Sequence, residues 1–239
     1  MASDKKVENY LNRIWNNWQF GSGPCQDCPN RDNAGCYTPY YGDGVLDAKI
    51  AFVAETPGGD RDIQNEDQLD WELPGSFIAK RGGASKPGWI TDGNRIPDEF
   101  FDRVDAWFER TGKYDRGIYF TNAKKCQDIN GKDMEWKNIK AKLHCREYLK
   151  PEMNAVDPEV MVVFGKKATD TTFDLYDVNE YIEAFNDVAL SVYRDNEPYV
   201  IPSYHWSNLF RNLRHLDGID DHNAYWESLA DTIKSTLDS

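Results

Sequence analysis

Four of the five cysteines have a spacing that could serve metal binding. Cys25 and Cys28 form a Cys-x-x-Cys pair, and a tight turn between them can aim both sulfurs at one centre. Cys126 follows an apolar run, and Cys145 lies on the helical pattern behind it. Four thiolates could hold a [4Fe–4S] cluster or a zinc ion, and the ligand count does not separate these two. A set of buried structural cysteines is the plain alternative, and Cys36 is spare in each case.

Three polar side chains follow short apolar runs. Glu55 is a carboxylate at a strand end, where it could position a water molecule. Asn122 carries both a donor and an acceptor, so its amide can read an amide-like edge. His205 follows another apolar run and is well placed for chemistry if that run is a strand. Each residue could also be an ordinary turn residue, so the elements around them decide between the two interpretations.

Alternating apolar patterns indicate an α/β fold. Strands are predicted at residues 49–54, 118–121, 160–164, 190–193 and 199–202. Helices are predicted at residues 7–18, 97–111, 135–156, 166–173 and 222–237, the third with Ile139, Leu143 and Leu149 facing inward.

The central strands are apolar throughout, which is typical of a mostly parallel sheet flanked by helices on both faces. No repeat or linker divides the chain. We therefore expect a single α/β domain over residues 1–239, with a cysteine-bearing loop at 21–47. The carboxyl ends of its strands should carry the site.

Composition limits the partners and the compartment. The chain has 28 basic and 41 acidic residues, a net charge of −13. This argues against a broad nucleic-acid surface, although a local basic rim can still bind DNA. No apolar stretch is long enough to span a membrane, and the polar first residues do not form a secretory signal. We expect an intracellular, cytoplasmic monomer that makes no membrane contact.

Taken in order, these motifs resemble those of the uracil-DNA glycosylase superfamily, and most of all its iron–sulfur branch, family 4. The resemblance extends over about residues 20–237. Cys25-x-x-Cys28-Pro29 resembles the first ligand pair, residues 52–58 (FVAETPG) resemble the motif V-G-E-[AG]-P-G, and Phe77 resembles the phenylalanine of P-F-V-G. Residues 122–126 (NAKKC) resemble N-V-V-K-C, Cys145 resembles the fourth ligand, and residues 205–211 (HWSNLFR) resemble H-P-S-x-L-L-R.

The resemblance implies an enzyme, a DNA repair glycosylase that hydrolyses the N-glycosidic bond of deoxyuridine after the base leaves the stack. Phe77 would stack on uracil, and Asn122 would hydrogen-bond to its N3–H and O4. His205 would stabilise the charge that develops on O2. Glu55 would orient water or offset the positive charge on the sugar. Trp206 or Phe210 would fill the gap left by the base.

The resemblance also implies a structural [4Fe–4S] cluster bound by Cys25, Cys28, Cys126 and Cys145. The partner would be uracil-containing DNA, double- or single-stranded. The residues expected to contact it flank the site loops: Lys80, Arg81, Lys86, Lys124, Lys125, Ser207, Arg211 and Arg214.

Some positions differ from the family motifs. Ala54 replaces a glycine, Thr56 replaces an alanine or glycine, and Trp206 replaces a proline. Two alternatives therefore stay open. One is a weak or inactive superfamily member that binds uracil-containing or single-stranded DNA. The other is a zinc-stabilised α/β binding module.

Overall fold

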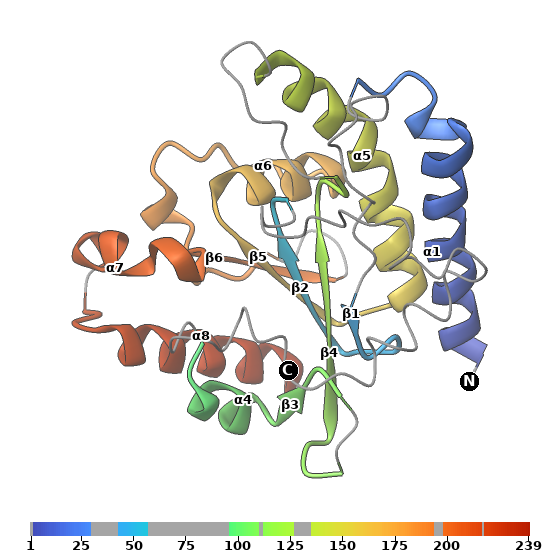
Figure 1. The fold of residues 1–239 in the computed structure, drawn as a ribbon. Coiled ribbons are helices and arrows are strands. Elements are labelled where there is room, and N and C mark those ends of the chain that lie inside the picture. Colours follow the sequence, from blue (N-terminus) through green and yellow to red (C-terminus); the bar gives the residue numbers. More distant parts are fainter. Residues whose placement is uncertain are drawn as a thin grey trace.

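A twisted, mostly parallel sheet forms the centre of the computed structural model, which describes residues 2–29, 43–56, 96–109, 112–126, 135–193, 198–216 and 218–239 (Figure 1). Its strands are β1 (Asp43–Gly44), β2 (Ile50–Ala54), β3 (Ala106–Trp107), β4 (Arg116–Asn122), β5 (Val160–Phe164) and β6 (Tyr199–Ser203). The order across the sheet is β1-β4-β2-β5-β6. Strands β4, β2, β5 and β6 are parallel, β1 pairs antiparallel with β4, and β3 pairs parallel with the start of β4. The expected fold class is confirmed.

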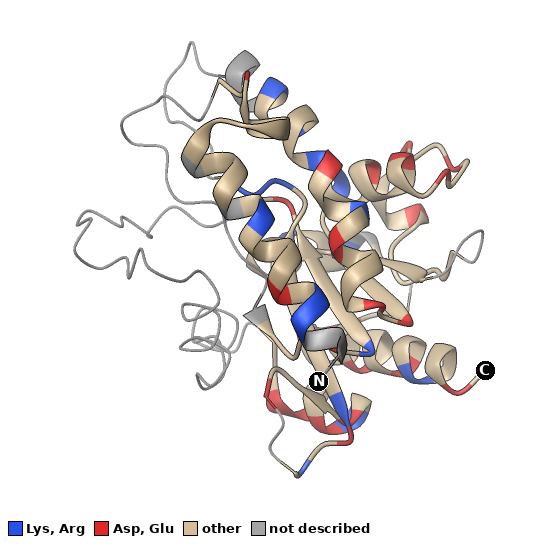
Figure 2. Cartoon of the chain, turned by 90° about the vertical axis from the view of Figure 1, so that its right-hand side faces the viewer, with Lys and Arg blue, Asp and Glu red and all other residues tan. Residues whose placement is uncertain are grey.

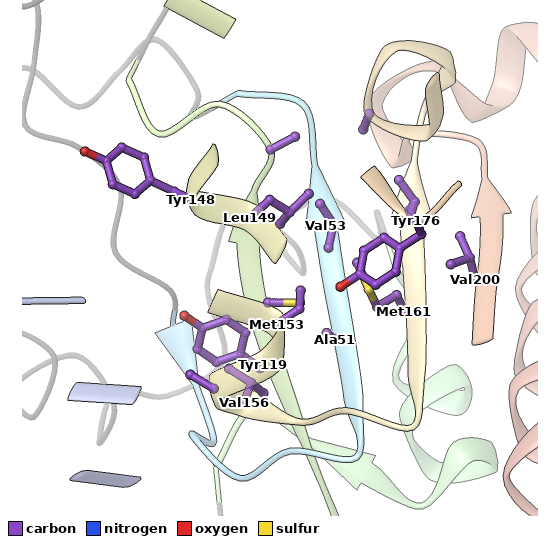
Figure 3. Close-up of a cluster of buried hydrophobic side chains, with 14 of the residues drawn as sticks. Ala51, Val53, Tyr119, Tyr148, Leu149, Met153, Val156, Met161, Tyr176 and Val200 are labelled. Carbon is purple, nitrogen blue, oxygen red and sulfur yellow. The ribbon is translucent and has the colours of Figure 1, made fainter. Parts of the chain in front are cut away.

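Alternation along β2 builds a core on each face of the sheet. Ala51 and Val53 face a cluster that includes α1 (Ala2–Phe20), α5 (Glu135–Val156) and α6 (Lys166–Leu175), part of which Figure 3 shows. Phe52 faces the opposite cluster, which includes α4 (Asp98–Val104) and α8 (His222–Leu237). All five residues of β2 are buried, as expected for a central parallel strand with helices on both sides.

The remaining short elements lie at the loops. They are η1 (Gly23–Cys25), η3 (Phe185–Asp187), η4 (Trp206–Asn208), α7 (Leu209–Asn212) and η5 (Leu213–His215). In the described ranges, no helix has the length and apolar content required to span a bilayer.

Two predicted elements differ from the structure. The helix expected at 97–111 ends at Val104, because Asp105 adopts the left-handed conformation (φ 50°) and the chain then enters β3. The strand expected at 190–193 is absent, and Tyr193, which is described, forms only an isolated antiparallel bridge to Val200. Leu190 has a positive φ of 66° in that segment, which a strand does not permit. The boundaries predicted at 135–156, 160–164 and 222–237 agree with the structure.

The inward face of α5 also differs from the prediction. Ile139 and Leu143 are 57% and 54% exposed, whereas Leu149 is buried as expected. The buried stripe instead includes Cys145 and Glu152. The Glu152 carboxylate interrupts the apolar pattern of this face, which hides the buried side of the helix in the sequence.

Candidate functional site

The turns after β2 and β4 are hydrogen-bonded to each other beyond the end of the sheet. Ala123 N–H donates to Ala54 O at 2.8 Å, and Lys124 N–H donates to Glu55 O at 2.9 Å. The Thr56 hydroxyl then donates to Cys126 O at 3.1 Å. The sheet register already pairs Ala54 with Asn122. Glu55 and Asn122 are therefore held side by side at the carboxyl edge.

A second connection joins the ends of β5 and β6. Gly165 N–H donates to Ser203 O at 2.8 Å. Gly165 has φ 89°, a conformation that side-chain-bearing residues rarely adopt, and it allows α6 to begin directly after β5. A Cβ added at Gly165 would lie 3.9 Å from the Cβ of His205. The first turn of α6 thus begins beside His205, at the end of β5, which lies between β2 and β6 in the sheet.

Glu55 is half-buried and has a cationic partner. Lys167 Nζ lies 3.2 Å from Glu55 Oε1, and the two side chains are 69% and 31% exposed, respectively. Lys167 lies in the first turn of α6, whereas Glu55 follows β2. The ion pair therefore joins two neighbouring strand ends across the candidate site.

The surroundings of His205 assign its neutral tautomer. Ser207 N–H donates to His205 Nδ1 at 3.3 Å, and the Ser207 hydroxyl lies 2.8 Å from the same nitrogen. An N–H can only donate, so Nδ1 must present its lone pair. In the neutral ring the proton is then on Nε2, and His205 offers an N–H donor at the edge.

Aromatic packing fixes the segment that carries His205. Trp206 is buried, and its ring centroid lies 4.9 Å from that of Phe164 and 3.9 Å from that of His205. Tyr204 N–H donates to the Tyr225 hydroxyl at 2.8 Å, which ties the same segment to α8. Trp206, at the position of the motif proline, is therefore a core residue and is not available as a wedge into DNA. Phe210, 75% exposed, stays the candidate for that role.

The four candidate cysteine ligands are all buried, and none of the four is part of a disulfide. The Cys25 sulfur and the Tyr148 hydroxyl are hydrogen-bonded at 3.3 Å, and Tyr148 lies one turn beyond Cys145 on α5. A hydrogen bond from Cys126 lowers the pKa of the Cys145 thiol to about 7, and the charges of nearby lysines add to this shift. These contacts bring η1, the β4–α5 connection and α5 to one corner of the molecule. No group of three or more acidic, histidine or cysteine side chains within the described residues has the geometry to hold a single metal ion.

Two lysines expected to contact DNA lie in the interior instead. Lys125 is ion-paired with Glu152, and the two side chains are 1% and 0% exposed. The Lys125 ammonium also donates to the Thr121 hydroxyl at 2.7 Å, and Tyr119 OH donates to Glu152 at 2.7 Å. Lys124 is 2% exposed. Both lysines are buried and the Lys125 charge is already paired, so neither ammonium is exposed for a phosphate contact in this structure.

The other predicted DNA contacts divide into two groups. Ser207, Arg211 and Arg214 are exposed along η4, α7 and η5. Lys80, Arg81 and Lys86 lie outside the described residues. Two residues with other assignments, Phe77 as the base-stacking candidate and Cys36 as the spare cysteine, also lie outside them.

Sequence reasoning missed Lys167, Tyr148 and Glu152. Lys167 had a usable signal, because it follows the strand at 160–164 and strand ends carry the site. Tyr148 and Glu152 had none, since only the fold reveals that they face Cys25 and Lys125.

Comparison with known proteins supplies a family and two relatives. The family model described as the uracil DNA glycosylase superfamily matches residues 41–230. The Type-4 uracil-DNA glycosylase of Archaeoglobus fulgidus is 26% identical over 154 residues, which are 64% of this chain and 61% of that protein. The Type-4 uracil-DNA glycosylase of Saccharolobus solfataricus is 24% identical over 168 residues, 69% of this chain and 63% of that protein. The chain thus spans less than two thirds of the length of either relative.

Proposed function

The chain belongs to the uracil-DNA glycosylase superfamily, and from this premise we propose that it hydrolyses the N-glycosidic bond of deoxyuridine in DNA. The observation that carries the proposal is the arrangement of Glu55, Asn122 and His205 at the carboxyl ends of β2, β4 and β6. A carboxylate, an amide and an N–H donor on one rigid edge are the groups that this reaction requires.

Asn122 is proposed to select the base. Its amide oxygen would accept the N3–H of uracil, and its amide nitrogen would donate to O4. Cytosine presents an amino group in place of O4 and has no N3–H, so it would leave a buried amide mispaired. Asn122 is 2% exposed. Water therefore cannot easily replace the hydrogen bonds that its amide would lose with a wrong base, which supports this role. Phe77 would stack on the base.

His205 and Glu55 are proposed to act on opposite charges of the transition state. As the glycosidic bond breaks, negative charge develops on uracil and positive charge on the sugar. The Nε2–H of neutral His205 would donate to O2 of the leaving uracil. The Glu55 carboxylate would offset the sugar charge or orient the attacking water.

We propose that the four thiols bind a [4Fe–4S] cluster. All four are buried, contacts among their segments bring them to one corner, and cysteine thiolates are the usual ligands of such clusters. Bound by Cys25, Cys28, Cys126 and Cys145, the cluster would be a structural crosslink without a redox step in the glycosylase reaction. It would tie η1 to the strand end that carries Asn122.

Replacing Asn122 by aspartate should lower uracil excision by roughly 10²-fold, because a buried polar group that loses its partner costs about 1–3 kcal/mol or more. The carboxylate cannot donate to O4 but can accept from the amino group of cytosine. Single-turnover excision from oligonucleotides with uracil or cytosine opposite guanine would measure both effects. Asn154→Asp, an exposed change near the far end of α5, is the matched control. Equal uracil excision by Asn122→Asp and wild type would contradict the assigned role.

The same assay decides the proposed function. Wild-type protein should excise uracil from the oligonucleotide. If it binds the oligonucleotide and retains its cluster but excises nothing, the chain is a non-catalytic member of the superfamily.

Purified wild-type protein should contain about four irons per chain and absorb broadly at visible wavelengths. Cys145→Ser should lose most of this iron, because Cys145 is a proposed ligand, whereas Cys36→Ser should keep it. Metal analysis of anaerobically prepared protein checks both variants. One zinc per chain without iron, or loss of iron in Cys36→Ser, would contradict the ligand assignment.

A further inference from the structure

The Lys167–Glu55 ion pair has a position that stability does not explain. Both members are solvent-accessible, at 69% and 31% exposure, and exposed ion pairs contribute little to folding. The neighbouring Lys166 shows what a structural lysine looks like in this helix. Its ammonium donates to Ile182 O at 2.6 Å and lies 3.6 Å from Asp170 on the next turn. Lys166 is thus bound to its own surroundings, whereas the Lys167 ammonium is paired with the candidate catalytic carboxylate.

Glu55 presents an electrostatic problem for a DNA-binding site. Its carboxylate must come close to the reacting sugar, which carries a phosphate on each side. The chain already has a net charge of −13. In the view of Figure 2, basic and acidic residues are interspersed along the helices rather than gathered into a basic face. With Lys124 and Lys125 buried, neither supplies a cation to this edge.

Lys167 is placed to supply that cation. It lies at the start of α6, between the strand end that carries Glu55 and the strand end that leads to His205. Its exposed, flexible side chain can reach outward from Glu55 without a change in the backbone. The partial positive charge of the α6 N-terminus favours an anion on the same side.

We propose that Lys167 binds the phosphodiester group next to the flipped deoxyuridine, moving from Glu55 to that phosphate as the DNA docks. In the free protein the ammonium neutralises Glu55 and reduces its repulsion of DNA. In the complex the exchange leaves the carboxylate unpaired, so its full charge faces the developing cation of the sugar. This inference rests on the proposed function, and it adds a phosphate-binding residue to that site.

Binding measurements at several salt concentrations test the phosphate contact. The probe is a duplex oligonucleotide with 2′-fluoro-2′-deoxyuridine opposite guanine, whose glycosidic bond resists cleavage. One phosphate contact contributes about 0.9 to the slope of log affinity against log salt. Between about 50 and 200 mM salt, wild type should therefore lose about 3.5-fold more affinity than Lys167→Ala. Lys166→Ala should match wild type, and Lys167→Arg should retain the wild-type slope.

The Glu55→Gln background distinguishes exchange from simple screening. If Lys167 leaves Glu55 to bind phosphate, Lys167→Ala should weaken binding at least as much in the Glu55→Gln background as in the protein that keeps Glu55. If Lys167 only screens Glu55, the effect of Lys167→Ala disappears once the carboxylate is gone, and the exchange is refuted. The exchange is also refuted if wild type excises uracil and Lys167→Ala has the same salt slope as wild type. Absence of excision by wild type would instead reject the proposed function.

Discussion

Replacing Glu152 by glutamine should lower the free energy of unfolding by about 3–5 kcal/mol, because it leaves the Lys125 ammonium buried without its counter-charge. Both side chains are almost fully inaccessible. Glu152 also accepts hydrogen bonds from Tyr119 and Thr121, at 2.7 and 2.9 Å. Urea unfolding of the intact protein, with its iron content checked beforehand, measures the change.

Two controls test whether the loss of stability comes from an unpaired buried charge. Removing both charges together, in Lys125→Met with Glu152→Leu, should cost much less than removing one, since no unpaired charge is left in the interior. The Lys49–Glu159 pair is about half exposed on both sides, so Glu159→Gln should change stability by at most about 1 kcal/mol. A Glu152→Gln protein as stable as Glu159→Gln would contradict the buried pairing.

The buried network also connects stability to the candidate site. Lys125 lies between Asn122, the proposed base reader, and Cys126, a proposed cluster ligand. Its ammonium donates a hydrogen bond to Thr121 on β4 and forms an ion pair with Glu152 on α5. The polypeptide that carries both functional residues is thereby fixed to the sheet and to the helix behind it. A loosened Lys125 should therefore weaken base selection as well as folding.

The sheet and its functional edge were predictable from the sequence because of hydrophobic burial. Central parallel strands are apolar throughout, so β2 and β5 appear as short apolar runs, and polar residues directly after them must lie at the edge. The fold class follows from this alternation, and the family match over residues 41–230 confirms the resemblance. The adjacency of Glu55 and Asn122 needed one further fact, the pairing of β2 with β4.

Side chains whose environment comes from distant segments were not predictable. Lys124 and Lys125 look like surface residues in sequence, because a lysine is rarely buried without a partner. The partner of Lys125 is Glu152, which is 27 positions away on α5 and breaks the apolar pattern of that helix. The end of α4 was missed for a local reason, since nothing in the sequence marked Asp105 for a left-handed conformation.

Replacing His205 by alanine should lower the single-turnover rate of uracil excision by roughly 10²–10³-fold, equivalent to about 2.7–4 kcal/mol. Substrate binding should change little, because the charge on O2 is present chiefly in the transition state. The loss follows from a fixed Nε2–H donor, whose tautomer is set by the hydrogen bonds that Ser207 makes to Nδ1. Rates measured at saturating enzyme, together with the dissociation constant of the uncleaved duplex, separate the two effects.

Ser207→Ala is the matched control for that donor. It removes the hydroxyl but keeps the residue 207 N–H that donates to Nδ1 at 3.3 Å, so the tautomer should persist. Loss of one neutral hydrogen bond of about 1 kcal/mol predicts roughly a fivefold lower rate. A graded series, with Ser207→Ala between wild type and His205→Ala, is expected if Ser207 acts through the imidazole. If His205→Ala excises uracil at the wild-type rate, His205 does not stabilise the leaving base. A residue at another strand end must then stabilise the negative charge on uracil O2.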